Sequence, residues 1–353
     1  FGRILEAMLR ERYPGLRFEV VNAAMTAINS NVVLPIAVDC ARLKPDLFIV
    51  YLGNNEVIGP YGPGTVFSSF VPNISFIRGN IFLRATKIGQ LITNMQQSMS
   101  GSKNIPETWG GMEMFSSRRL RADDPRLKEV YKHLRRNLED ICRVARRAGA
   151  QVILSTVATN LKDCPPFYSL HKKNLSDKEK KLWNVNYQNG IKLEKAGKYE
   201  RAAAEYQKAL LIDDKFAELQ FRLGYCYWRL SQYELARGYF TRAQDLDALR
   251  FRADTEINNT IRNVALRNKD KGVLLADTEK AFKMMSFQGI PGEELLWEHV
   301  HLNFAGNYLL AKTVLSEVDR VLAKKGYKNS EVILSVEECM RKIAYTDWNR
   351  YKL

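Results

Sequence analysis

An internal repeat with a period of 34 residues limits the fold of this chain more than any other feature of its sequence. Five positions carry the same or a similar residue in both copies: Gly190 and Gly224, Tyr199 and Tyr233, Ala202 and Ala236, Tyr206 and Phe240, and Ala209 and Ala243. Two unrelated amphipathic helix pairs, the alternative, would not be expected to match so often at one offset. A repeat of this length holds one helix pair, so the sequence predicts an all-helical unit over residues 178–250.

The repeat resembles the tetratricopeptide repeat, a family of helix pairs that stack side by side. Leu223-Gly224-x-x-Tyr227 and Ala236-x-x-x-Phe240 fit its pattern, although Asp214 stands where the usual proline ends a unit. Two units cannot bury their apolar faces alone, so we expect them to lean on the rest of the chain or on flanking helices near residues 178–183 and 249–262. The resemblance makes this unit a candidate for binding a protein partner.

The rest of the sequence alternates apolar runs of strand length with stretches of helical spacing. We expect strands at residues 18–22, 46–52, 151–157 and 272–277, helices at 4–12, 32–43, 132–147 and 303–324, and a long excursion without periodicity at 59–125. This alternation is typical of a parallel sheet with helices on both faces. We therefore predict an α/β fold with a doubly wound parallel sheet and an all-α insertion. Residues 1–177 and 251–353 would be the two parts of the α/β domain.

The composition is that of a core-forming chain with a strongly basic surface. Hydrophobic residues make up 46% of the sequence, and the formal net charge is +15. Part of this charge lies on residues 132–147, where a solvated helix face explains it and a surface for anionic glycans or membrane headgroups is the alternative. Basic and aromatic residues do not interleave as in nucleic-acid modules, so we expect no nucleic-acid partner.

The cysteines and the apolar runs further limit the classes of protein to which this chain can belong. The five cysteines lie far apart and form no C-x-x-C pair, which argues against a zinc knuckle or a disulfide framework. No run approaches the roughly 18 apolar residues of a membrane-spanning helix. The chain begins at Phe1 in what looks like the middle of a helix. We expect any signal or membrane anchor to lie upstream, so that membrane contact comes only through that segment.

Two short polar motifs stand out in the predicted α/β part. Gly53-Asn54-Asn55-Glu56 directly follows the run 46–52, and Glu298-His299-Val300-His301 precedes the predicted helix 303–324. In doubly wound sheets, ligands bind at the carboxyl ends of the strands. We therefore expect the two motifs to meet at that edge, although about 250 residues separate them in sequence.

The motifs resemble two of the four sequence blocks of the SGNH (GDSL-like) hydrolases. The first resembles the third block, Gly-x-Asn-Asp, and the second resembles the fourth block, Asp-x-x-His, with Glu56 and Glu298 in place of the aspartates. Ala24 lies where the second block has a glycine, and the first block, Gly-Asp-Ser, would lie upstream of Phe1. The resemblance covers most of the chain outside the insert. It implies an SGNH-type, flavodoxin-like fold.

The resemblance also implies a serine-esterase site whose nucleophile is not in this chain. His301 would be the general base, and Glu298 would hold its imidazole in the correct tautomer. Asn55 would donate its side-chain amide to the oxyanion. The backbone N–H of Ala24 would be a second donor, and the pocket would be completed by Gly53 and Asn54.

Each of these residues also has a plainer interpretation. Asn55 is a common turn residue after a strand, and a lone His301 is often a structural histidine. His299 and His301 could instead form an H-x-H metal pair, but the other histidines lie elsewhere, and we predict neither a metal nor a cofactor. Ser30, the serine nearest to the second block, is interpreted as a helix N-cap and not as a displaced nucleophile.

The predicted function is therefore that of a serine esterase or deacetylase. Its substrate would carry an O-acyl group on a small molecule or a polysaccharide, for example an acetylated glycan. One alternative is an O-acyltransferase that uses the same site. The other is a catalytically decayed scaffold that binds proteins through its repeats, which the departures at Ala24 and Glu298 favour. By resemblance, the location would be extracytoplasmic, with an anchor upstream of Phe1.

Overall fold

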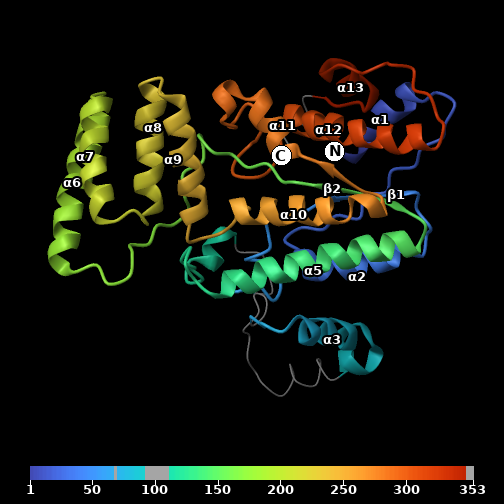
Figure 1. Cartoon of the computed structure of the whole chain (residues 1–353), viewed down its shortest axis with the longest axis horizontal. Helices are drawn as coiled ribbons and strands as arrows, with labels where there is room; N and C mark the ends of the chain where they lie inside the picture. The colour runs from blue at the N-terminus through green and yellow to red at the C-terminus, as the bar shows by residue number, and fades with distance from the viewer. Residues whose placement is uncertain (67–69, 92–110, 347–353) are drawn as a thin grey trace.

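A small parallel sheet forms the centre of the molecule outside the repeat (Figure 1). The computed structural model describes residues 1–66, 70–91 and 111–346. Strands β1 (Leu47–Tyr51), β2 (Gln151–Ser155) and β3 (Val273–Ala276) lie side by side in that order, and both pairings are parallel. Three of the four predicted strands are therefore present. Together with the helices, they give a mostly helical protein built around a three-stranded sheet.

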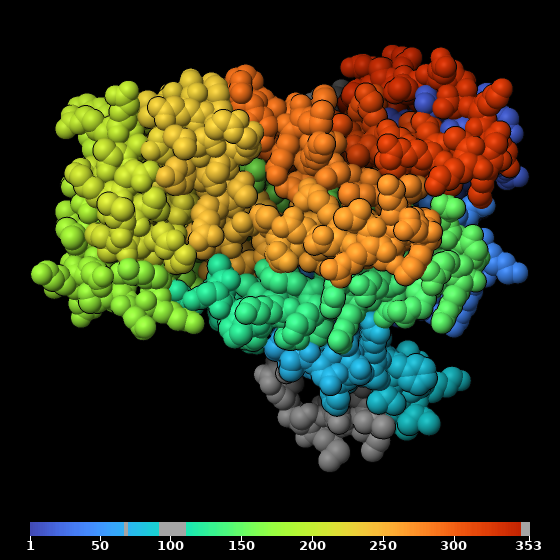
Figure 2. Space-filling view, in the orientation of Figure 1, coloured from blue at the N-terminus to red at the C-terminus, as the bar shows by residue number. Residues whose placement is uncertain are grey.

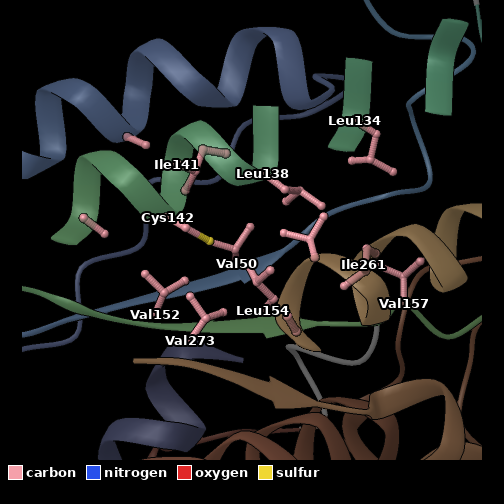
Figure 3. Close-up of a cluster of buried hydrophobic side chains, with 14 of the residues drawn as sticks. Val50, Leu134, Leu138, Ile141, Cys142, Val152, Leu154, Val157, Ile261 and Val273 are labelled. Atoms are coloured by element: carbon pink, nitrogen blue, oxygen red, sulfur yellow. The ribbon is translucent and has the colours of Figure 1, made fainter. Parts of the chain in front are cut away.

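One face of the sheet is covered by three helices. These are α2 (Ser30–Ala41), α5 (Arg126–Arg147) and α10 (Thr255–Arg267). Figure 3 shows the apolar core beneath them, where Leu138 and Ile261 reach down to Val50 and Leu154 on the strands. Burying a side chain of this size contributes about 1.5–3 kcal/mol, so this core is a major source of the stability of the sheet.

The opposite face is covered by helices from the two ends of the chain. These are α1 (Gly2–Arg12), α12 (Phe304–Lys324) and α13 (Val336–Lys342), which share one apolar cluster with the strands. Because β2 has a neighbour on each side, all but its first residue are buried. β1 is paired on one side only within the described residues, and most of it is only half-buried.

The remaining elements are short. They are α3 (Ile74–Ala85), α11 (Thr278–Met285) and the 3-10 turns η1 (Met112–Phe115), η2 (Lys269–Lys271) and η3 (Phe287–Gly289). The expectation of an excursion without periodicity at 59–125 is wrong for α3. The Asn73 side chain caps the start of this helix, because it accepts hydrogen bonds from the N–H groups of Ser75 and Phe76. None of the described helices is both long enough and apolar enough to cross a bilayer.

The prediction of a strand at residues 18–22 is wrong. Phe18 and Val20 pack against the α1–α12 cluster while Val21 is exposed, so the segment has the alternating burial of a strand. It nevertheless forms no ladder with any strand of the described chain. Alternation of apolar residues reports which side of an extended segment is buried, and it does not report whether a neighbouring strand is there to pair with it.

The insert consists of four helices and no strand, as the repeat predicts. They are α6 (Asp177–Lys195), α7 (Tyr199–Ile212), α8 (Ala217–Arg229) and α9 (Tyr233–Leu246). The same glycine–aromatic contact recurs in both repeat units, 34 residues apart. Gly190 faces the ring of Tyr206, and Gly224 faces the ring of Phe240. The flanking helices are assigned differently from the expectation. Residues 178–183 belong to α6 itself, and α10 begins only at Thr255 and covers the sheet.

The insert is attached to the α/β part by a buried ion pair. Arg252 contacts Asp247 at 3.2 Å, and both side chains are almost fully buried. Arg252 also donates to the carbonyl oxygen of Asn160 at 2.9 Å, beyond the end of β2. Asp247 in turn accepts hydrogen bonds from the backbone N–H groups of Phe167 and Tyr168. The C-terminal end of the insert is therefore held to the segment between β2 and α6.

We predict that Gly224→Ala destabilises the protein by about 1–3 kcal/mol, because a Cβ there would lie 2.8 Å from the Phe240 ring. Gly238→Ala on α9 is the matched control, because nothing lies within 4 Å of its new methyl group. In that open helical position alanine should stabilise by about 0.5–1 kcal/mol. Urea unfolding measures both changes, and equal effects of the two substitutions would contradict the contact between Gly224 and Phe240.

Candidate functional site

The motif that contains His301 lies in a tight loop that leads into α12. Leu296 and Leu302 form an antiparallel bridge across the base of this loop, and the N–H of Trp297 donates to the carbonyl of His301 at 2.8 Å. Asn303 then caps α12, because its side chain accepts a hydrogen bond from the N–H of Gly306 at 3.0 Å. Glu298 and His301 are therefore held on one short, closed loop.

Glu298 is the centre of this loop. One carboxylate oxygen accepts from the Nδ1 and the backbone N–H of His301, each at 2.7 Å, and from the N–H of Val300 at 3.2 Å. The other oxygen contacts Nδ1 of His299. Burial alone would raise the pKa of Glu298, but the hydrogen bonds from His299 and His301 outweigh it and lower this pKa far below its usual range. The two histidines therefore favour the carboxylate form of Glu298.

His301 is oriented by Glu298 and is otherwise open to solvent. Its side chain is 77% exposed, and Nδ1 is engaged with the carboxylate. Within the described residues, no protein group bonds to Nε2. The hydrogen bond from Glu298 raises the pKa of His301, against the opposing effect of its partial burial. When the imidazole is neutral with its proton on Nδ1, the free Nε2 can accept a proton.

His299 has a different environment from His301. It is buried, and its ring meets Phe167 edge-on at 5.1 Å between ring centroids and lies near Phe251 at 6.2 Å. Its carbonyl accepts the N–H of Asn160 at 3.0 Å. His299 and His301 both direct Nδ1 at the same carboxylate, and no group of three or more metal-binding side chains occurs in the described part of the chain. The arrangement gives His299 a packing role.

The motif after β1 is held by packing and by one long-range hydrogen bond. A Cβ on Gly53 would lie 3.0 Å from side-chain atoms of both Val157 and Ile257, so glycine suits this close approach. The side-chain oxygen of Asn54 accepts from the backbone N–H of Ala253 at 3.1 Å, just before α10. Gly53 and Asn54 therefore fix the position of the loop in which Asn55 lies.

Asn55 is half-buried, and its side-chain amide forms no hydrogen bond with another described residue. An unpaired amide at the carboxyl end of a strand is available to a ligand, as an oxyanion donor must be. No direct contact joins Asn55 to His301 among the described residues. The two motifs are linked indirectly, since the bond from Asn54 ends at Ala253 and the nearby Phe251 ring lies against His299.

Ala24 lies in an exposed segment before α2. Its backbone N–H, the predicted second oxyanion donor, donates to the side-chain oxygen of Asn22 at 3.0 Å. This N–H would have to leave Asn22 before it could bind a substrate oxygen. The predicted role of Ala24 in the oxyanion hole therefore requires a rearrangement of residues 22–24.

A buried polar network beneath Asn55 was not foreseen from the sequence. Glu56 accepts hydrogen bonds from the N–H and the hydroxyl of Ser30, at 2.8 and 2.7 Å, and Asn137 on α5 donates to the same hydroxyl at 3.0 Å. Ser30 is the first residue of α2 and Asn29 precedes it as the N-cap, which corrects the N-cap assignment. Burial raises the pKa of Glu56 to about 7, although both bonds from Ser30 oppose this shift.

Comparison with known proteins supports one part of the sequence interpretation. A family model, the TPR repeat, matches residues 190–231, which run from the second half of α6 through α8. Comparisons with curated proteins and with solved structures give no match. The chain therefore contains a tetratricopeptide-type helical region, and the resemblance to SGNH hydrolases stays a prediction.

We predict that Glu56→Gln changes how stability depends on pH. The native state holds the Glu56 proton more tightly than the unfolded chain does. Glu56 therefore lowers the free energy of unfolding as pH rises from about 4.5 to about 7, and it causes no further loss above pH 7. The variant should therefore gain stability relative to the parent over this range, by up to about 3 kcal/mol. Urea unfolding at several pH values measures this gain. Glu19→Gln, at an exposed position, is the control, and a parallel shift in both variants would contradict the prediction.

We predict that Glu298→Gln lowers the pKa of His301 toward its ordinary value of 6.5, because the carboxylate that stabilises the imidazolium is lost. NMR titration of the histidine Cε1 protons measures this change. His133 is an internal control in the same spectra, since its pKa is lowered by burial on α5, away from Glu298. An unchanged His301 titration would show that the pair does not form in solution.

Proposed function

We propose that this chain carries the base, the orienting acid and one oxyanion donor of a serine-esterase site for O-acyl substrates. His301 is the base, Glu298 is the orienting acid, and Asn55 is the donor. The nucleophilic serine would come from a segment upstream of Phe1. The observation that carries the proposal is the bond from Nδ1 of His301 to Glu298, which leaves an exposed Nε2 that can accept a proton.

In the proposed reaction, Nε2 of His301 takes the proton of the serine hydroxyl as its oxygen attacks the acyl carbonyl. Glu298 stabilises the imidazolium that forms, and Asn55 donates to the oxyanion of the tetrahedral intermediate. His301 then gives the proton to the leaving alcohol. Water, activated by the same imidazole, releases the acyl group as a carboxylic acid and restores the serine.

The sheet supports a place for the segment that would carry the serine. β1 has one unpaired edge within the described residues, and residues 18–22 are extended without a hydrogen-bonded neighbour. A further parallel strand beside β1 would end at the same edge of the sheet as Gly53 and Asn55. In parallel α/β sheets, that carboxyl edge is where ligands bind.

The exposure of His301 favours hydrolysis over acyl transfer to another alcohol. An O-acyltransferase must keep water away from the acyl-enzyme. The His301 side chain is 77% exposed, so water reaches the base directly. The proposal is therefore an esterase or deacetylase, with an acylated small molecule or an acetylated glycan as its substrate.

The tetratricopeptide-type helices support a second, compatible role. Repeats of this class stack into extended surfaces that bind other proteins. Here they are joined to the segment after β2 through Arg252 and Asp247. We propose that a protein partner binds to these helices and that its binding is separate from the ester chemistry.

We predict that His301→Ala in the full-length protein lowers kcat for p-nitrophenyl acetate by at least about 10³-fold. Glu298→Gln should leave more residual activity, because orienting the base contributes less than the base itself. Asn55→Ala should cost on the order of 10²-fold in kcat, as the loss of one oxyanion donor does. Asn263→Ala, an exposed amide on α10, is the matched control and should leave kcat unchanged.

Two results would contradict the proposal. One is full activity of the His301→Ala protein. The other is turnover by this 353-residue chain alone that His301→Ala abolishes, because the nucleophile would then lie within the chain. A fluorophosphonate probe should label one serine upstream of Phe1 in the full-length protein, and labelling should be lost in His301→Ala.

A further inference from the structure

Helix α3 is apolar on two opposite sides. Ile74 and Ile77 are buried against the body of the protein. Phe76, Phe82 and Leu83 are 67%, 71% and 58% exposed. A surface helix of a globular protein normally has one apolar face and one polar face, so the second apolar side of α3 calls for a partner.

The spacing of the exposed residues places them together on the outward side of α3. Phe76 and Leu83 are seven residues apart and therefore lie on one face of the helix, with Phe82 beside Leu83. Ile88 and Leu91, a little further along the chain, are also exposed. Exposed apolar side chains therefore occur on the outward face of α3 and after its end, whereas Ile74 and Ile77 are buried against the body of the protein.

α3 is held firmly enough to present this face in a fixed direction. Arg78 forms an ion pair with Asp140 at 2.6 Å and donates to Asn137 at 3.0 Å, and both partners are on α5. His133, also on α5, contacts the carbonyl of Pro72 at 2.9 Å. Figures 1 and 2 show α3 on the far side of α5 from the sheet, where it projects from the body of the molecule.

The charged residues of the segment that holds α3 are all basic, and the acidic Asp140 of α5 contacts α3 only on its inward side, through Arg78. The sequence from residue 57 to residue 106 contains no aspartate or glutamate. Arg84 and Lys87 lie at and just after the end of α3, are exposed, and form no ion pair within the described residues. The exposed apolar residues of α3 and the unpaired cations beside them therefore complement a surface with an apolar interior and anionic groups on its outside.

We propose that the outward face of α3 binds the surface of an anionic lipid bilayer. Phe76, Phe82 and Leu83 would enter the region between headgroups and acyl chains, and Arg84 and Lys87 would meet the lipid phosphates. The helix would lie in the plane of the interface, because its 12 residues span only about 18 Å. The basic charge of the whole chain, +15, adds a long-range attraction to the same surface.

Co-sedimentation of this chain with vesicles tests the proposal. The parent protein should bind vesicles of phosphatidylcholine and phosphatidylserine, and Phe76→Ser with Leu83→Ser should weaken this binding at least tenfold. The matched control is Leu211→Ser with Leu266→Ser, two leucines on α7 and α10 that are more exposed than Phe76 and Leu83, and it should bind like the parent. Arg84→Gln with Lys87→Gln should weaken binding to the anionic vesicles and reduce its salt dependence, because the phosphate contacts are lost.

Three outcomes would overturn the proposal. The first is a parent protein that binds none of the vesicles, and the second is an α3 variant that binds them as well as the parent does. The third is a parent dimer, seen by light scattering, that the α3 variant dissociates, because this face would then be a contact between copies. Near-UV circular dichroism establishes that each variant is folded, and Phe82→Ser alone replaces the double variant if it is not. The His301→Ala variant should bind vesicles normally, so this test stands apart from the esterase assay.

Discussion

The buried pair of Arg252 and Asp247 is the interaction on which the arrangement of the candidate site depends. Arg252 binds the carbonyl of Asn160 after β2, and Asn160 in turn donates its N–H to the carbonyl of His299. Directly after Arg252, the N–H of Ala253 binds Asn54. The Arg252 side chain thus connects the repeat to the loop of the histidines, and the next residue, Ala253, connects it to the loop after β1. Removing one partner of such a pair leaves an uncompensated buried charge, which typically costs about 3–5 kcal/mol.

The longer reach of glutamate explains how one carboxylate can serve two histidines. Glu298 contacts His299 on one side and His301 on the other, and it also accepts the backbone N–H of His301. The buried ring of His299 packs against Phe167, and its contact with Glu298 fixes the position of the Glu298 carboxylate. His301 is therefore oriented by a group that is itself held in place, although the imidazole is in contact with solvent. An exposed side chain normally loses rotamer entropy when it is fixed in a catalytic orientation. Because Glu298 already holds the His301 imidazole, less of this entropy remains to be lost.

Much of the fold could be predicted because its signals are local. Apolar runs identified β1, β2 and β3, and the 34-residue period identified the four helices of the insert. The contact between Glu298 and His301 was also predictable, since three residues separate them. The failures concern long-range partners. Residues 18–22 alternate correctly but have no neighbouring strand among the described residues. The partner of Glu56, Ser30, lies 26 residues away, and Asn137, which donates to the Ser30 hydroxyl, lies further still.

The closed base of the insert has a consequence for the order of folding. β2 and β3 are neighbours, yet Thr156 and Asp277 at their ends are 121 residues apart in sequence. Closing so long a loop in a flexible chain carries an entropic cost that slows the pairing. The N–H of Ala248, just after α9, binds the carbonyl of Tyr168, nine residues before α6, at 2.9 Å, so the folded repeat and the linker before it bring residues 168 and 248 together. Helices that form from local contacts therefore shorten the effective loop between β2 and β3. We expect the repeat to fold first and β3 to pair with β2 afterwards.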